Sequence, residues 1–316
     1  MSPPREASRR VACFGGRVEV LVGGSSPSGT AEQLAALLAQ GRLRSLHGRL
    51  SRFEPSSELS LLNADPHEVV HASRLLRRLA RAVVEAGERT GGLVDATLVG
   101  AIERAGYATS RAGLPGLAAA ELMARTRPPR PARPHPDRAW RRIVVDDGAR
   151  TITRPPGLRI DSGGLGKGLA ADLVAGTLAT HPAFAVDCAG DVRIGGSARV
   201  ARRVLVEHPF GGAPVHELSI VDGAVATSGV SRRSWRDAGG AAAHHLLDPA
   251  TGAPAWTGVL QATALAPTAL EAETLAKAAL LAGPQEGREL LVHGGVLVLD
   301  DASVHVVRRE PAVRAA

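Results

Sequence analysis

The sequence is short of aromatic residues and cysteines, and it has no long apolar run. Aromatic residues make up 3% of 316 residues, so a flat ligand has few rings to stack on. Its two cysteines, Cys13 and Cys188, lie too far apart for a disulfide framework or a zinc-binding pattern, so we expect two core thiols. No apolar stretch approaches the roughly 20 residues that cross a bilayer, so no membrane span is expected.

The N-terminus offers no signal for export. Arg9 and Arg10 precede apolar residues, but Arg17 and Glu19 interrupt that run before a signal-peptide core can form. No lipid-attachment motif is evident either, and a cytoplasmic location is therefore expected.

The net charge of +7 is concentrated in one segment, RTRPPRPARPHPDRAWRR. Its prolines disfavour helices and sheet ladders, so the arginines are expected on solvated, extended chain. Without interleaved aromatic residues or a known nucleic-acid module, this segment argues against a nucleic-acid partner. We interpret 125–142 as a linker between an N-terminal α/β half, 1–124, and a β-rich half, 143–316.

Periodicity predicts an α+β fold with largely antiparallel sheets flanked by helices. Val18–Val22 alternates as a strand, and a helix follows from about Thr30, with Gln33 in the capping-box position. A second helix covers 71–89. Short strands dominate the second half, where helices are expected to be few, at about 167–180 and 268–282.

The segment DSGGLGKG, residues 161–168, is expected to end a strand and open a helix. Its glycines leave backbone amides bare for an anion at the helix N-terminus, although a plain glycine-rich turn is the alternative. It is not a Walker motif, because Asp161 replaces the first glycine and Gly168 replaces the Ser or Thr. The chain has only two lysines, Lys167 and Lys277, among 38 basic residues, and a compact ammonium suits phosphates.

Four further residues have both a structural and a functional interpretation. Asp95 follows a glycine pair and either caps the next helix or faces a ligand. His245 precedes a turn at Pro249 and is either structural or chemical. Glu273 and Lys277 stand at i,i+4 on a helix, where a surface ion pair is the simplest interpretation.

The segment SGVSRRSW, which begins at Ser228, follows a strand and offers hydroxyl and amide donors. Arg233 stands where the serine-hydrolase pattern GxSxG needs its last glycine, which argues against that class of enzyme.

Seven segments between about Phe14 and Gly283 read SRFEPSSELSLLN, GLVDATL, LRIDSGGLGKGLAADL, VDCAGDVRIGG, AVATSG, HHLLDPATG and AETLAKAALLAG. In their order and spacing they resemble the ApbE-type FAD:protein FMN transferase family. The resemblance implies two halves around an FAD cleft, with Mg²⁺ on the pyrophosphate. A Thr or Ser hydroxyl of an acceptor flavoprotein, within a short flavinylation motif, would attack the FMN phosphorus and release AMP.

The resemblance also implies roles for individual residues. His245 matches the family histidine, for which we suggest proton handling. Lys277 would take part in catalysis, and the metal would be held by Gly166, through its carbonyl, and by Glu273. FAD would contact Phe53, Leu93, Val94, Asp95, Asp161, Gly164, Gly166, Lys167, Ser228 and Gly229.

One departure from the family pattern concerns the metal site. The family has Asp and, four residues on, Thr as metal ligands, and this chain has Glu273 and Lys277 in those places. A charged lysine cannot bind Mg²⁺, so either fewer ligands hold the metal or the ammonium takes over part of its role. An Mg²⁺-dependent FAD pyrophosphatase and a non-catalytic flavin-binding protein remain as alternatives.

Overall fold

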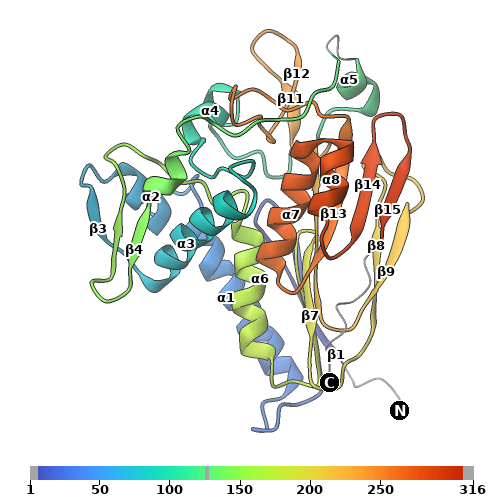
Figure 1. The fold of residues 1–316 in the computed structure, drawn as a ribbon. Coiled ribbons are helices and arrows are strands. Elements are labelled where there is room, and N and C mark those ends of the chain that lie inside the picture. The colour runs from blue at the N-terminus through green and yellow to red at the C-terminus, as the bar shows by residue number, and fades with distance from the viewer. Residues whose placement is uncertain (1–5, 125–127, 309–316) are drawn as a thin grey trace.

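An eight-stranded antiparallel sheet is the largest sheet of the computed structural model, which describes residues 6–124 and 128–308 (Figure 1). In spatial order its strands are β1 (Glu6–Cys13), β2 (Gly16–Gly23), β6 (Ala183–Cys188), β7 (Asp191–Gly195), β10 (Gly223–Gly229), β13 (Val259–Ala266), β14 (Gly295–Leu299) and β15 (Val304–Val307). Every neighbouring pair is antiparallel.

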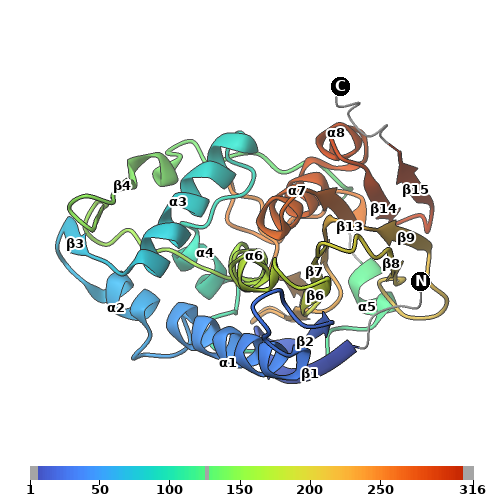
Figure 2. The same ribbon diagram turned by 90° about the horizontal axis from the view of Figure 1, so that it is seen from below.

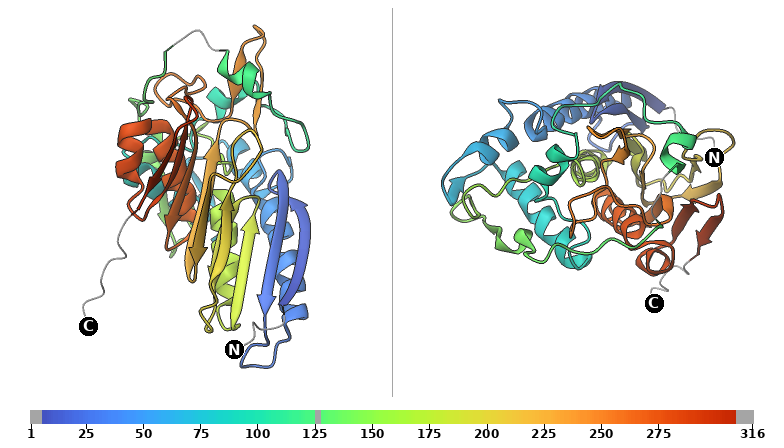
Figure 3. Two further views of the ribbon diagram at one scale, coloured as in Figure 1. Left: turned by 90° about the vertical axis from the view of Figure 1, so that its right-hand side faces the viewer. Right: turned by 90° about the horizontal axis from the view of Figure 1, so that it is seen from above.

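Three helices cover one face of this sheet: α1 (Glu32–Leu50), α6 (Gly166–Leu178) and α7 (Ala269–Ala282) (Figures 2 and 3). They pack respectively on β1 and β2, on β6 and β7, and on β10 and β13. Alternation along the strands explains this layer, since Ala224 and Ala226 of β10 join the helix-side core and Val225 points to the other face. On that other face the hairpin of β8 (Arg202–Val206) and β9 (His216–Ile220) completes a second apolar cluster.

A smaller module lies beside the helix layer (Figure 1). It consists of α2 (Glu58–Ala64), α3 (Arg74–Arg89) and a sheet of β3 (Val69–His71), β5 (Thr151–Thr153) and β4 (Val144–Asp146). The remaining elements are α4 (Val99–Arg104), α5 (Ala119–Met123), the 3-10 helix η1 (Ala139–Arg142), β11 (Ser234–Arg236), β12 (Ala242–His244) and α8 (Pro284–Leu290). Within the described ranges, no helix is long and apolar enough to cross a membrane.

The α+β prediction is confirmed, and the long helices lie close to their predicted positions as α3, α6 and α7. Two local expectations are wrong, and one strand was missed. The helix predicted from about Thr30 begins close by, at Glu32, but its N-cap, Ala31, offers no side-chain cap, so the Thr30–Gln33 capping box does not form. Residues 158–161 form no strand before the glycine-rich loop, and β1 lies where no strand was predicted.

The predicted linker 125–142 is fixed to the body of the molecule over the part that is described, 128–142. The amide of Arg130 donates to Trp256 O at 2.9 Å, and that of Ala132 donates to Leu281 O at 2.9 Å. Arg130 is exposed, as expected, but Trp140 is 1% exposed within the main core. The division into halves stays a prediction, although β1 and β2 from 1–124 share one sheet with strands from 143–316.

Both cysteines are buried free thiols, as predicted. Burial raises the pKa of the Cys13 thiol to about 11. Burial also raises the pKa of the Cys188 thiol well above its usual value, so neither thiol is poised as a nucleophile near neutral pH.

Candidate functional site

A cleft of about 1320 Å³ opens at one end of the large sheet. Because neighbouring strands are antiparallel, this end collects the β1–β2 turn, the β6–β7 turn, the end of β10 and the start of β13. Loops from the helix layer close its sides. The volume exceeds the roughly 300–1,000 Å³ of ordinary small-molecule pockets, so an extended ligand fits.

Nearly all of the residues predicted from the sequence line this one cleft. They are Phe53, Leu93, Val94, Asp95, Asp161, Gly164, Lys167, Ser228, Gly229, His245, Glu273 and Lys277. Gly166 is buried at the first turn of α6, where its amide donates to Ser162 O at 2.7 Å, and is not among the lining residues. The structure thus brings the predicted residues together, and their individual roles remain proposals.

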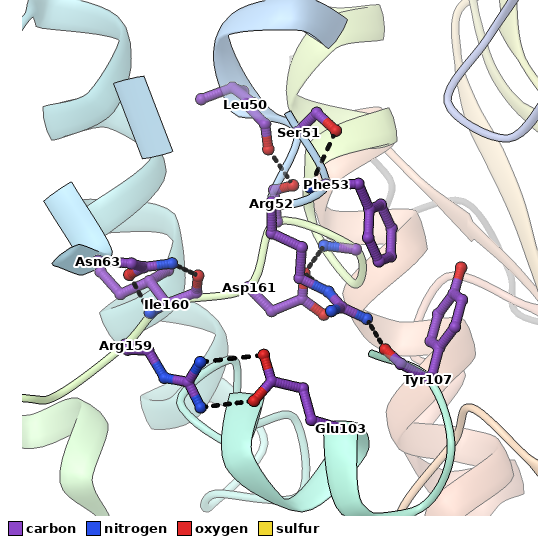
Figure 4. A network of polar contacts seen from close by, with 12 residues as sticks. Leu50, Ser51, Arg52, Phe53, Asn63, Glu103, Tyr107, Arg159, Ile160 and Asp161 are labelled. Carbon is purple, nitrogen blue, oxygen red and sulfur yellow. Dashed lines mark hydrogen bonds and ion pairs between the residues drawn. The ribbon is translucent and has the colours of Figure 1, made fainter. Parts of the chain in front are cut away.

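Aromatic side chains form a wall at one part of the cleft, and two of them, Phe53 and Tyr107, are drawn in Figure 4. Phe53 and Tyr107 lie with ring centroids 5.5 Å apart, and Trp235 extends the cluster 5.6 Å from Tyr107. The guanidinium of Arg52 lies 4.1 Å from the Phe53 ring centroid and 4.9 Å from that of Tyr107. Three of the chain's eight aromatic residues therefore gather at one place, with a cation between two of them.

Arg52 also ties this wall to the glycine-rich loop. Its Nε lies 3.4 Å from Asp161 Oδ1, and an Nη donates to Tyr107 O at 2.6 Å (Figure 4). Asp161 in turn accepts from Gly163 N at 3.0 Å, and its own amide donates to Ala96 O at 2.8 Å. These contacts fix the chain just before α6.

The first turn of α6 places Lys167 at the floor of the cleft. Its Nζ lies 2.7 Å from Asp191 Oδ2, and the Asp191 side chain is 1% exposed. Burial opposes the charge on Lys167, but the Asp191 and Glu273 carboxylates outweigh burial and raise the pKa of the ammonium. Lys167 is therefore a fixed cation at neutral pH.

Helix α7 brings Glu273 to the same floor. The two helices approach so closely that a Cβ at Gly168 would lie 2.5 Å from Ala269 O, which explains the glycine there. Glu273 is 2% exposed, and its Oε2 accepts from Gly168 N at 2.9 Å. Burial and the Asp191 charge raise the pKa of Glu273, against the charges of Lys167 and Lys277. The interpretation of Glu273 and Lys277 as a surface ion pair is therefore wrong.

His245 follows β12 and lines the cleft near Arg233. Its Nδ1 lies 3.3 Å from Arg233 O, and since a carbonyl only accepts, Nδ1 carries the proton of this hydrogen bond. Nε2 then has the free lone pair of a base. Burial lowers the pKa of His245 well below its usual value, and the charges of Arg233, His244 and Lys277 act in the same direction.

Asp95 does not cap a helix. Its Oδ1 accepts from Thr97 N at 2.8 Å and from Thr97 Oγ1 at 2.6 Å, while α4 begins only at Val99, with Leu98 as its N-cap. The cap interpretation is wrong, and Asp95 stays a ligand-contact prediction.

The charged residues that sequence reasoning missed include Arg52 and Arg233, which line the cleft, and Asp191, which is buried and paired with Lys167. Asp191 stands in the segment VDCAGDVRIGG, and Arg52 precedes the predicted Phe53, so both were next to recognised positions. An acid that follows a glycine at the start of a buried strand was the available signal for Asp191. Arg233, which lines the cleft and donates to Phe14 O at 3.0 Å, had been considered only as a departure from the hydrolase pattern.

Comparison with known proteins points to one family. The model of the ApbE family matches residues 14–299 of the chain. A curated relative, the FAD:protein FMN transferase of Treponema pallidum (strain Nichols), is 33% identical over 153 residues. That match covers 43% of this chain and 41% of the relative, so it spans less than half of the relative's length.

Solved structures show the same fold over almost the whole chain. The ApbE protein of Thermotoga maritima superposes with a TM-score of 0.78 at 23% identity, covering 97% of this chain and 100% of that one. The apo flavinyl transferase ApbE of Pseudomonas stutzeri gives 0.75 at 19% identity, covering 97% and 96%. The flavin transferase ApbE of Vibrio cholerae gives 0.72 at 18% identity, covering 96% and 97%.

Proposed function

Because the chain belongs to the ApbE family, we propose that it is an FAD:protein FMN transferase that splits FAD and joins FMN to a Thr or Ser of an acceptor flavoprotein. The observation that supports this proposal most is the convergence of the predicted residues on one cleft, from Phe53 near the N-terminus to Lys277 near the C-terminus. The Treponema relative carries this activity in its name.

FAD occupies the cleft with its pyrophosphate at the N-terminus of α6. The N-terminal end of α6, with the amide of Gly164 beside it, and the Lys167 ammonium supply positive potential there. One flat ring of the dinucleotide packs on the aromatic wall of Phe53 and Tyr107, which offers it ring faces in a chain with few aromatic residues.

The transfer step needs a base and charge stabilisation. The acceptor hydroxyl gives its proton to Nε2 of His245, and its oxygen attacks the FMN phosphorus. As the new P–O bond forms, the bond from this phosphorus to the bridging oxygen breaks, and AMP leaves with the electron pair. The lysines at the floor of the cleft stabilise the charge that develops on the phosphates.

Magnesium was expected on Gly166 and Glu273, and the side chains present do not fit it. Mg²⁺ takes oxygen ligands in an octahedral arrangement. Within the described ranges, no group of three or more His, Cys, Asp or Glu could hold a metal. In the Glu273 carboxylate, only Oε1 is buried without a hydrogen bond and could bind a metal. The next residue along this face of α7 is Lys277, one helical turn away, whose ammonium cannot act as a ligand. No step of the proposed reaction is therefore assigned to a metal.

The experiment incubates the protein with FAD and an acceptor flavoprotein domain that carries a threonine flavinylation motif. In-gel fluorescence measures covalent flavin, and chromatography measures AMP and FMN. We expect fluorescent acceptor and one AMP per flavin transferred. An acceptor with that threonine replaced by alanine is the matched control and should stay dark.

Two other results would contradict the proposal. Free FMN and AMP with a dark acceptor would identify an FAD pyrophosphatase. Bound but uncleaved FAD would identify a flavin-binding protein.

A further inference from the structure

The side chain of Lys277 lies against the glycine-rich loop. A Cβ placed on Gly164 would lie 3.0 Å from Lys277 Cε and 3.7 Å from Nζ. Gly164 and Lys277 both line the cleft. The ammonium is therefore beside the loop that precedes α6, where the proposed function puts the FAD pyrophosphate.

The two lysines of the cleft differ in whether their ammonium group has an ion-pair partner. The Lys167 ammonium is paired with Asp191 Oδ2 at 2.7 Å. Lys277 is half-buried, and among the residues that the structure describes it makes no hydrogen bond or ion pair. Burying an ammonium that has no carboxylate partner costs free energy, and a bound anion would offset that cost. The cleft is therefore suited to bind an anion at Lys277.

The neighbouring charges favour an anion over a second cation. Two carboxylates, Glu273 and Asp191, and two cations, Lys167 and Arg233, act on Lys277. With its own charge, three cationic groups therefore meet two carboxylates at this place, and a further carboxylate, Asp187, lines the cleft near Lys167. One Glu273 oxygen already accepts from Gly168 N. A divalent ion here would be held by few oxygens and repelled by nearby ammonium groups, whereas a pyrophosphate would be attracted.

We infer that the Lys277 ammonium takes the place of a catalytic metal ion, so that this chain binds and cleaves the FAD pyrophosphate without a divalent cation. This inference rests on the proposed function for the cleavage step and on the geometry of the cleft for the binding step. In the reaction the ammonium faces the phosphate oxygens as the bond to AMP breaks, and it neither gains nor loses a covalent bond.

The test first measures the affinity of FAD for the wild-type chain by calorimetry, in EDTA and in MgCl₂. We expect the two dissociation constants to agree within about twofold, since no site fills with Mg²⁺. A wild-type chain that binds FAD only with Mg²⁺ would overturn the inference, and this arm needs no variant.

Two substitutions then separate charge from shape. Lys277→Met keeps the apolar stem and removes the charge, so FAD cleavage should fall by about 100-fold in EDTA and in Mg²⁺ alike. Lys277→Thr supplies a hydroxyl ligand beside Glu273, so its cleavage should fall equally in EDTA and recover in part with Mg²⁺. Glu271→Ala, on the same helix but paired with Arg89, is the matched control and should behave as wild type.

Each possible outcome decides something. If Lys277→Met cleaves and binds FAD like wild type, the ammonium has no such role. If no acceptor is flavinylated, the proposed function fails, but equal FAD affinity with and without Mg²⁺ and weaker binding by Lys277→Met would still support the binding part. Melting curves of both variants check that they fold.

Discussion

At Gly164, a single added methyl group would contact the side chain of Lys277 in the cleft. A Cβ at this position would meet Lys277 Cε at 3.0 Å, which is closer than ordinary contact. Gly164→Ala should therefore displace the ammonium by a fraction of an ångström and slow FAD cleavage by up to about 100-fold, with little change in stability. Turnover measured at saturating FAD checks this expectation.

Gly176→Ala supplies the matched control for Gly164→Ala. Gly176 is exposed in α6, and nothing lies within 4 Å of a Cβ there. This change should leave turnover unaltered and stabilise the helix by about 0.5–1 kcal/mol. Equal turnover in the two alanine variants would contradict the crowding argument.

Arg52 joins three features of the cleft through one planar group. Its side chain is 6% exposed, lies over the Phe53 ring, and bridges Asp161 and Tyr107 O (Figure 4). Arg52→Lys keeps the charge but loses the planar fork, so we expect a cost of about 1–3 kcal/mol in unfolding free energy and weaker FAD binding. Denaturant unfolding and an FAD titration measure the two effects, and a variant unchanged in both would contradict this role.

At the scale of elements, the segment before β4 is locked to α3 by one aromatic side chain. A Cβ on Gly87 of α3 would lie 2.4 Å from Trp140 Cδ2, so the indole packs directly on the helix backbone. Gly87→Ala should cost about 1–3 kcal/mol through overpacking, although alanine ordinarily favours a helix. The measurement is the free energy of unfolding in denaturant.

Gly41→Ala in α1, where nothing lies within 4 Å of a Cβ, is the control for that helix effect. It should raise stability rather than lower it. If Gly87→Ala also raises stability, Trp140 is not packed as described and 128–142 is closer to the loose linker first predicted.

The elements that were predictable from the sequence are those with clear start and stop signals, such as a capping residue and a terminal glycine. Helix α7 follows its capping residue Thr268, whose side chain accepts from Glu271 N, and ends at Gly283. By contrast, β1 carries Arg9 and Arg10 along an outer strand, and its pairing with β2 was not recognised from the short Phe14–Gly15 turn that joins the two strands. The burial of Trp140 was equally hidden, because its partner Gly87 lies far away in the sequence.

The same distinction holds for the site. Gly164 and Lys167 were recognisable because a glycine-rich loop before a helix has a local physical meaning. The ion pair of Lys167 with Asp191 was not, since it depends on how α6 packs on β7. The pairing of charges in the cleft is thus a property of the tertiary fold.

At the scale of the whole molecule, the pH dependence of stability depends on a histidine that is neutral in the folded chain. His244 is fully buried, its Nδ1 accepts from Leu246 N at 3.3 Å, and burial lowers its pKa to about 3. The unfolded chain takes up a proton on this ring near its ordinary pKa of about 6.5, while the folded chain does not. The unfolded state therefore binds more protons below that pH, and stability must fall as the solution is acidified.

We expect His244→Gln to remove this dependence between about pH 6 and pH 4. The free energy of unfolding of the wild type should fall more steeply there than that of the variant, by about 1.4 kcal/mol per pH unit, which corresponds to one proton. Denaturant unfolding at several pH values measures both slopes, and the comparison cancels the carboxylates that the two chains share. His71→Gln, at an exposed histidine, is the control and should leave the slope unaltered. Parallel curves for wild type and His244→Gln would contradict this expectation. They would mean that His244 is protonated in the folded chain and is more accessible to water than its burial indicates.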